Sequence, residues 1–182
     1  MKFKTKKDTQ MNQEDTEMED ETMAAHLLFG EIDVDSARDA VEYILTVPSD
    51  EVTLLINSVG GSLDNCVSII NAMSMSGKSI KTIGIGSVCS SALLIFLAGN
   101  TRVMFRNAHV LSHQASLEYQ GKPHEVAGVN KHVKRIDDWM IDHVTSRTNM
   151  TRSQVKKYLL GPGENWISTA ECLKWGICDL LA

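Results

Sequence analysis

Apolar stretches alternate with helical patterns along the chain after residue 22. Residues 24–29, 52–57 and 80–85 are predicted to be strands, and the nearly continuous apolar run of 52–57 is typical of a strand buried on both faces. Apolar positions recur at three- and four-residue steps in 37–45 and 63–73, which predicts helices between the strands. Two successive strand–helix crossovers predict a parallel sheet with right-handed connections.

Glycines follow the second and third predicted strands. Residues 58–61 are predicted to form a turn, because paired glycines allow positive φ and close backbone approach, and 86–89 are predicted to form a second turn. Residues 90–98 are so uniformly apolar that we expect a helix buried in the middle of the domain. Two further short strands are predicted at 101–105 and 109–112.

The longest predicted helix covers about residues 122–147 and begins near Pro123. Its apolar residues form a narrow stripe, and charged residues cover the remaining surface. Such a stripe resembles a coiled-coil seam, so we expect a partner helix in the same chain or in a second subunit. The prediction then contains two short helices that begin at the capping-box pairs Thr151/Gln154 and Ser168/Glu171, a loop at 161–163 between them, and a last strand at 177–181.

The 182 residues fit one domain, and their net charge of -5 argues against a nucleic-acid partner. The charge is uneven, because residues 1–7 are basic whereas 14–21 are strongly acidic and lack aromatic side chains. Such a segment buries too little apolar surface to offset the entropy of ordering it. We therefore predict a flexible acidic tail at 1–22 and a folded domain at 23–182.

No apolar stretch approaches the roughly 20 residues that span a bilayer, and the N-terminus lacks the apolar core of a secretory signal. We expect a soluble, cytoplasmic protein that contacts no membrane. The four cysteines lack the spacing of a zinc site and are interpreted as reduced core residues, so no metal or cofactor is expected. They are Cys66, Cys89, Cys172 and Cys178.

The pair Gly60-Gly61 is the first feature that could carry chemistry. Sites in open α/β sheets form beyond the carboxyl ends of the strands, and exposed backbone N–H groups there can hold an anion or a developing oxyanion. The alternative is a tight turn without a ligand.

Ser90 is the second feature, because it lies at the start of the buried helix, where unsatisfied backbone donors and the positive end of the helix dipole converge. That position suits a nucleophile, but it also suits a simple N-cap residue. Cys89 is a weaker nucleophile candidate, since its neighbours are small and apolar rather than electropositive.

Two histidines form the third feature. Alternation along the strand puts His109 and His113 on the same face, and either imidazole could act as a general base for Ser90. Periodicity does not choose between them.

Together, four segments resemble the proteolytic subunit of the Clp protease. Residues 56–61 (INSVGG) are similar to the family's INSPGG, 82–92 (TIGIGSVCSSA) to its nucleophile segment GxAASMG, His113-Gln114 with 119–121 to its histidine motif, and 171–179 to its EAxxYGLxD. The resemblance covers roughly residues 29–181 in order. It implies an α/β fold of the crotonase/ClpP-like type, with repeated β-β-α units, a parallel sheet and a protruding handle helix.

The resemblance also implies a serine endopeptidase that acts through an acyl-enzyme. Ser90 would be the nucleophile, and His113, rather than His109, would be the base. The backbone N–H groups of Gly61 and Ser91 would form the oxyanion hole, with Ser91 in the place of the family's methionine. The family's third catalytic residue, an aspartate, falls on Glu164, and Asn165 is the neighbouring alternative.

For partners, the resemblance implies self-association into heptameric rings, stacked in pairs as a tetradecamer, that enclose the active sites and admit peptides or unfolded proteins. An acidic tail stands where the family carries the segment that helps to dock an ATPase. An AAA+ unfoldase partner, and with it ATP dependence, is therefore left open.

Alternative interpretations belong to other classes. A related peptidase that processes phage capsid proteins is compatible with the altered tail, whereas a Ser–Lys signal peptide peptidase would need a lysine that is not clearly placed here. An acyl-CoA enzyme of the crotonase superfamily would share the fold and the two-amide oxyanion hole. An inactive subunit of a mixed ring would not need to retain Ser90 and His113.

Overall fold

The computed structural model describes residues 25–116 and 119–182, so the tail predicted at 1–22 lies outside the described residues. In chain order the elements are β1 (Ala25–Ile32), α1 (Val34–Thr46), β2 (Glu51–Gly61), α2 (Leu63–Met75), β3 (Ser79–Cys89), α3 (Ser91–Ala98), β4 (Thr101–Met104), β5 (His109–Ser112), α4 (Pro123–Arg147), α5 (Arg152–Tyr158), β6 (Asn165–Ile167), α6 (Thr169–Lys174) and β7 (Leu180–Leu181).

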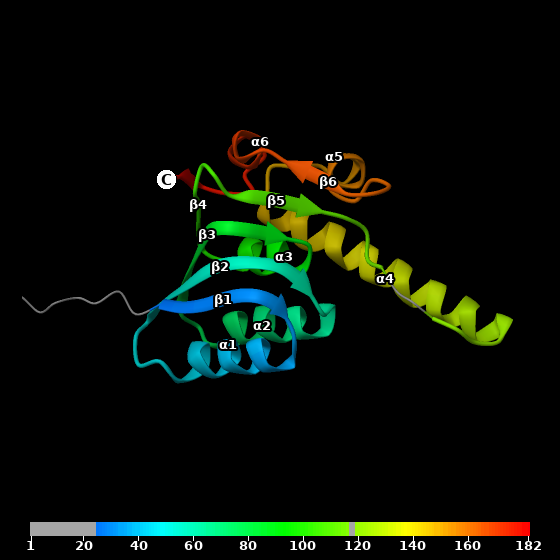
Figure 1. The fold of residues 1–182 in the computed structure, drawn as a ribbon, viewed down its shortest axis with the longest axis horizontal. Coiled ribbons are helices and arrows are strands. Elements are labelled where there is room, and N and C mark those ends of the chain that lie inside the picture. Colours follow the sequence, from blue (N-terminus) through cyan, green and yellow to red (C-terminus); the bar gives the residue numbers. More distant parts are fainter. Residues whose placement is uncertain (1–24, 117–118) are drawn as a thin grey trace, which may run out of the picture.

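The strands form one sheet, in which β1, β2, β3, β4 and β7 lie side by side in that order (Figure 1). All of these neighbours pair in parallel, which confirms the predicted parallel sheet. The second half of β3 pairs in parallel with β5, and β5 pairs antiparallel with β6. The sequence did not predict β6, because three residues are too few to show a period-two pattern.

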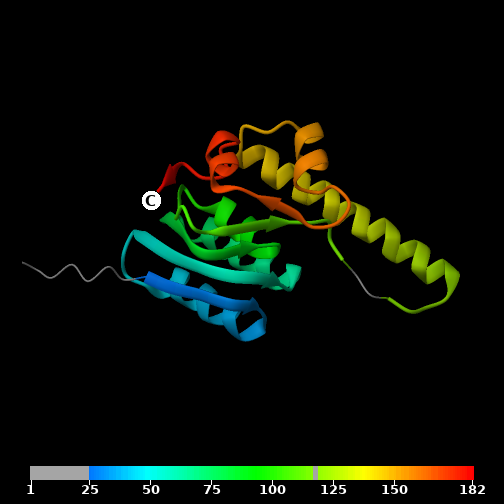
Figure 2. The same ribbon diagram turned by 45° about the horizontal axis from the view of Figure 1, so that its top comes forward.

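Helices α1, α2 and α3 cover one face of the sheet (Figures 1 and 2). Alternate residues of β2 are fully buried, whereas Thr53 and Leu55 are half-buried and Asn57 is exposed, so the prediction of a strand buried on both faces is wrong, because the helix layer lies against one face. All eight residues of α3 are buried, so the prediction of a helix in the middle of the domain is confirmed. Because α3 follows directly after β3 and Ser90, its buried position fixes where the turn at Ser90 lies.

The turns predicted at 58–61 and 86–89 are wrong, because β2 continues to Gly61 and β3 to Cys89. Neighbouring strands supply partners to both segments: Ile32 pairs with Gly61, and β5 pairs with residues 87–89. The register between β2 and β3 shifts between Ile56 and Ser58. Strands β2 and β3 thus each consist of two consecutive strand segments that precede a helix. This is the strand–strand–helix unit of the expected fold.

Several predicted helix starts are confirmed by their caps. The Asp33 side chain accepts from the Ser36 backbone N–H at 2.9 Å at the start of α1. The capping boxes predicted at Thr151 and at Ser168 both form, at the starts of α5 and α6. These caps satisfy backbone donors that would otherwise lack partners.

Helix α4 is the long helix predicted from the apolar stripe. Its C-terminal half buries Met140, Ile141 and Val144 against the body of the domain, whereas its N-terminal half projects beyond the sheet (Figures 1 and 2). Val126 in the projecting half is 36% exposed. The helix therefore extends an apolar stripe away from the domain that carries it.

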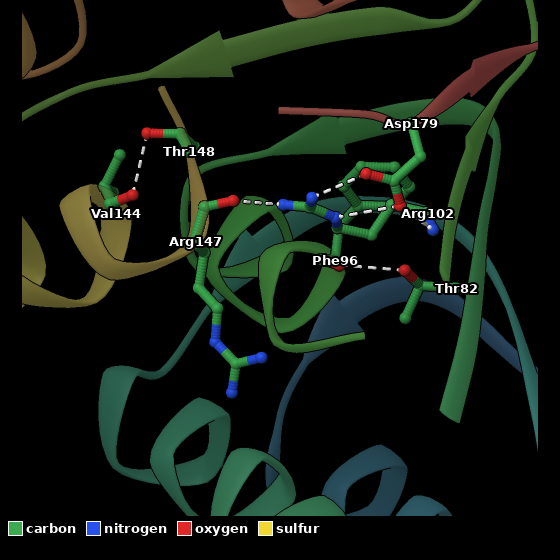
Figure 3. A network of polar contacts seen from close by, with 7 residues as sticks. All are labelled: Thr82, Phe96, Arg102, Val144, Arg147, Thr148 and Asp179. Carbon is green, nitrogen blue, oxygen red and sulfur yellow. Dashed lines mark hydrogen bonds and ion pairs between the residues drawn. The ribbon is translucent and has the colours of Figure 1, made fainter. Parts of the chain in front are cut away.

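Arg102 anchors the C-terminal end of α4 (Figure 3). Its guanidinium donates to both carboxylate oxygens of Asp179, at 2.7 and 3.3 Å, and to the backbone carbonyl of Arg147. The side chain of Arg102 is only 12% exposed, whereas that of Asp179 is 39% exposed, so water reaches the pair from the Asp179 side. These contacts hold β4, the end of α4 and the segment before β7 together.

Candidate active site

A cavity of about 300 Å³ lies where β2 and β3 end, between the start of α3, the end of β5 and helix α4. Four of the five residues assigned to the site from the sequence line this cavity: Gly61, Ser90, Ser91 and His113. Glu164 is not among the lining residues. Apolar side chains from α3 and α4 form much of the remaining wall, namely Leu94, Val133, Ile136 and Met140.

Ser90 forms the sharp turn between β3 and α3. It is the only non-glycine residue with a positive φ in the described part of the chain, with φ 55° and ψ -124°. Such a conformation is sterically unfavourable for a residue with a Cβ and costs on the order of 1–3 kcal/mol. Ser90 occupies the N-cap position of α3, as the alternative expected, but its side chain makes no capping hydrogen bond. The hydroxyl group is therefore left for other chemistry.

Gly60 brings β2 against this turn. Its φ is +93°, and a Cβ added to it would lie 2.7 Å from both the Cys89 carbonyl oxygen and the Ser90 Cβ. The same added atom would lie 3.1 Å from the Ser91 nitrogen. Only glycine fits at this position, because any side chain would push the Ser90 turn away.

Gly61 is similarly confined on the other side of the strand. Its φ is +151°, and an added Cβ would lie 2.6 Å from the carbonyl oxygen of Ile32 in β1. The two glycines thus let the end of β2 pass between β1 and the Ser90 turn. They bring the backbone of β2 against the Ser90 turn, and the oxyanion site expected from the sequence at Gly61 stays a prediction.

A backbone hydrogen bond connects the serine to the strand that carries the histidine. The Ser90 N–H donates to the carbonyl of Leu111 at 2.8 Å. His113 follows two residues later, just past the end of β5. Of the two histidines that alternation could not separate, His113 lines the cavity and His109 does not.

The His113 ring already has one partner. Its Nδ1–H donates to the carbonyl oxygen of the adjacent Gln114 at 2.6 Å. A proton held at Nδ1 leaves Nε2 with its lone pair, which is the form that a general base requires. The side chain of Gln114 in turn donates to the Leu160 carbonyl at 2.9 Å, which ties this segment to the chain that follows α5.

Glu164 immediately precedes β6, and His113 immediately follows β5, the strand that pairs with β6. The antiparallel ladder of β5 and β6 pairs Val110 with Ile167 and ends where Ser112 pairs with Asn165; continued by one step, the same register would set Glu164 opposite His113. Residues that face each other across such a ladder have side chains on the same face. Glu164 is exposed, and no hydrogen bond between the two side chains is formed among the described residues.

Asn165, the alternative third residue, is occupied elsewhere. Its side-chain nitrogen lies 3.2–3.3 Å from the carbonyl oxygens of Ser112, Leu159, Gly161 and Gly163. This amide therefore holds the 159–163 loop against the end of β5. It supports the segments that carry His113 and Glu164 and does not enter the cavity.

Similarity to known proteins agrees with this geometry. A family model described as Clp protease matches residues 7–182. The chain belongs to the Clp protease family. It is 28% identical over 134 residues to the ATP-dependent Clp protease proteolytic subunit 2 of Tropheryma whipplei (strain Twist), a match that covers 72% of this chain and 73% of that protein.

Two further relatives carry the same description. The ATP-dependent Clp protease proteolytic subunits 2 of Leifsonia xyli subsp. xyli and Corynebacterium jeikeium are 26% and 29% identical over 157 residues, which is 82% of this chain and 70% and 74% of those proteins. The family resemblance, the α/β fold and the serine endopeptidase class expected from the sequence are thereby confirmed.

Within this Clp protease family member, Cys89 is a poor nucleophile. Burial raises the pKa of its thiol, and the negative charge of Glu164 raises it further. A thiol with a raised pKa is protonated at neutral pH, whereas the thiolate is the reactive form. The influence of Glu164 also places its carboxylate within electrostatic reach of the residue next to Ser90.

Several polar residues of the cavity were missed by the sequence analysis, and His132 and Asp64 are the titratable ones among them. His132 reaches the cavity from α4 and Asp64 from the first turn of α2. Both lie among polar residues on a helix surface, so no sequence signal separates them from ordinary solvent-exposed side chains. No group of His, Cys, Asp and Glu that could hold a metal ion occurs in residues 25–116 and 119–182. In the same ranges, no helix has the length and apolar character needed to cross a membrane.

Proposed function

We propose that Ser90 is the nucleophile of this endopeptidase and that His113 is its general base. The observation that carries the proposal is the strained Ser90 turn, which shares one cavity with His113 and with Gly61 of β2. Strain of this kind persists where the surrounding structure enforces it, and a sharp strand-to-helix turn is the usual setting of an exposed serine nucleophile.

The chemistry follows from these positions. Ser90 Oγ attacks the scissile carbonyl of a peptide and gives its proton to Nε2 of His113. The negative charge on the carbonyl oxygen is stabilised by the N–H groups of Gly61 and Ser91. Collapse of the intermediate expels the amine, which takes the proton from His113, and leaves an acyl-enzyme that water hydrolyses by the same steps in reverse order.

Glu164 is the third residue of the proposed triad. The register of β5 and β6, which continued by one step would set it opposite His113, supports this role, and its carboxylate would stabilise the imidazolium that forms during the reaction. In the present conformation the Gln114 carbonyl accepts the Nδ1–H bond. The Nδ1–H of the imidazole therefore already has a backbone acceptor without Glu164.

The proposed substrates are peptides or unfolded protein chains. Leu94, Val133, Ile136 and Met140 give the cavity an apolar wall that would accept an apolar side chain next to the scissile bond. Family membership favours this reading over an acyl-CoA enzyme of the same fold.

Self-association into rings, stacked so that the active sites face a chamber, is part of the proposal. The projecting half of α4 and its apolar stripe support it, because such a surface needs a partner. The relatives are named as subunits of an ATP-dependent protease, so docking to an AAA+ unfoldase in the cytoplasm is the corresponding proposal for this chain. Elution from gel filtration at the mass of one chain would contradict the ring.

A fluorophosphonate probe tests the catalytic assignment. The assembled wild-type protein should be labelled, Ser90→Ala should abolish labelling, and His113→Ala should slow it at least about 10²-fold, in line with general-base catalysis. His109→Ala is the matched control, because His109 lies on the same strand outside the cavity, and it should label at the wild-type rate. An unlabelled but assembled wild type would overturn the proposal, and loss of labelling only in His109→Ala would overturn the choice of base.

A further inference from the structure

The hydroxyl group of Ser91 has a specific partner next to the proposed oxyanion hole. Ser91 is 4% exposed, and its Oγ donates to the carbonyl oxygen of Gly61 at 3.2 Å. The hydrogen bond joins the first residue of α3 to the last residue of β2. It is made by the side chain that stands where the family resemblance expects methionine, which has no hydroxyl to donate.

The carbonyl of Gly61 belongs to the peptide that links Gly61 to Ser62, and both ends of this peptide are held. The oxygen accepts from Ser91, and the Ser62 N–H donates to the Ile32 carbonyl at 2.9 Å. A peptide plane anchored at its oxygen and at its nitrogen cannot rotate without breaking a hydrogen bond.

The peptide before Gly60 is held as well. The Gly60 N–H donates to the hydroxyl of Ser58 at 3.1 Å, and Ser58 is 1% exposed. The peptide between Gly60 and Gly61, which carries the Gly61 N–H, is therefore bracketed by two anchored peptides. Glycine has the freest backbone of all residues, so this bracket is what limits the orientation of that N–H.

We infer that Ser91 is a positioning residue that fixes the oxyanion hole. Its backbone N–H is one of the two proposed donors and has no acceptor within α3, because Ser91 is the first residue of the helix. Its hydroxyl holds the glycine segment that provides the second donor. One residue thus sets the distance between the two N–H groups that must converge on a single oxygen.

The inference rests on the proposed function, since it concerns donors for the oxyanion formed on Ser90. Removing one donor outright typically costs about 10²- to 10³-fold in kcat. Ser91→Ala keeps both N–H groups and removes only the hydrogen bond that holds one of them. A net hydrogen-bond contribution corresponds to about a fivefold to tenfold effect, so we expect kcat to fall by about that factor with KM unchanged.

The test compares Ser91→Ala with Ser91→Thr, which keeps a hydroxyl, in steady-state hydrolysis of a fluorogenic peptide by the assembled protein. Ser91→Thr should recover kcat. The affinity of a peptide boronate, which forms a tetrahedral adduct with a serine nucleophile, should weaken in Ser91→Ala by the same factor as kcat/KM.

Thr82→Val is the matched control. The Thr82 hydroxyl donates to the Phe96 carbonyl at 2.8 Å at the opposite end of α3, away from the cavity (Figure 3). It should lower the melting temperature as Ser91→Ala does and leave kcat unchanged. If Ser91→Ala lowers only the melting temperature, or raises KM and leaves kcat intact, the inference is wrong while the proposed function stands. If wild type neither labels nor hydrolyses peptides, the proposed function itself fails.

Discussion

The serine and histidine sides of the candidate site differ in how they are held, although Gly60, Glu164 and Asn165 do not line the cavity itself. The serine wall, defined as Gly60, Gly61, Ser90 and Ser91, is confined by backbone on all sides, since no Cβ fits on either glycine. The histidine wall, defined as His113, Gln114, Glu164 and Asn165, lies at the end of a short antiparallel ladder and is largely exposed. The serine wall therefore tolerates almost no change in shape, whereas the histidine wall can redistribute its hydrogen bonds.

The largest expected effect is that of Gly60→Ala on the serine wall. The new Cβ would lie 2.7 Å from the Cys89 carbonyl oxygen and the Ser90 Cβ, so the turn must move. A displacement of about 1 Å at reacting groups can cost about 10²-fold in rate. We expect peptide hydrolysis to fall by at least that factor, together with a lower melting temperature in differential scanning fluorimetry.

Gly163→Ala is the counterpart beside the histidine wall. Its φ is +83°, so it meets the same backbone preference, but no atom lies within 4 Å of an added Cβ. Gly77→Ala, with φ +67° and equally open space, reports the cost of backbone strain alone, far from the cavity. Both variants should lose stability and keep hydrolysis within a few-fold of wild type. Equal losses of activity in Gly60→Ala and Gly163→Ala would show that the serine wall and the histidine wall tolerate a change in shape equally, which would contradict the difference described above.

Glu164→Gln should have an intermediate effect. Loss of the carboxylate from a serine–histidine–aspartate triad can cost about 10⁴-fold, chiefly because the imidazole takes the wrong tautomer. Here the Gln114 carbonyl accepts the Nδ1–H and fixes the tautomer without Glu164. We therefore expect kcat/KM to fall by only about 10- to 10²-fold. A loss near 10⁴-fold would show that the carboxylate displaces the carbonyl in the working enzyme.

The smallest expected effect is that of pH on the contact between α3 and α4, two helices that contribute apolar residues to the cavity. The Nε2–H of His143 on α4 donates to the Leu94 carbonyl of α3 at 2.9 Å, and its ring stacks on Trp139. Burial lowers the pKa of His143, so the folded protein resists protonation at this ring. The unfolded chain takes up the proton below about pH 6.5, and stability must fall as the pH drops through that value.

We expect the melting temperature to be lower at pH 5.5 than at pH 7.5, because a lowered pKa in the folded state removes stability as the pH falls. His143→Gln should reduce this pH dependence. It should leave a remainder, because burial also lowers the pKa of His26. An unchanged slope in His143→Gln would mean that this contact does not couple the α3–α4 interface to pH.

Hydrophobic patterning predicted most of the fold, because long buried elements repeat their apolar positions many times. The uniform apolar character of 90–98 located the central helix, and the stripe of α4 located the handle. Patterning failed where glycines were interpreted as turn residues, which is their usual role. Residues 58–61 have the composition of a turn, yet they pair with β1 as part of a strand. Only the pairing with a neighbouring strand decides between a turn and a strand for such a segment.

The site was predictable to the extent that it depends on spacing along the chain. Ser90 and His113 follow strands that end at the same edge of the sheet, so their meeting in one cavity follows from topology. The register that, continued by one step, would set Glu164 opposite His113 depends on β6, which is too short to be detected. His132 lines the cavity because α4 passes along it, and no local sequence pattern predicts the course of that helix.

The conformation of Ser90 has a consequence for how this chain can change over time. A strain of about 1–3 kcal/mol at one residue is a sizeable share of the 5–15 kcal/mol that keeps a typical domain folded. Glycine at this position would relieve the strain and remove the hydroxyl, so the inactive protein would be the more heat-resistant one. Selection for stability alone would therefore discard the serine, and its proposed role as nucleophile is the chemical reason to keep it.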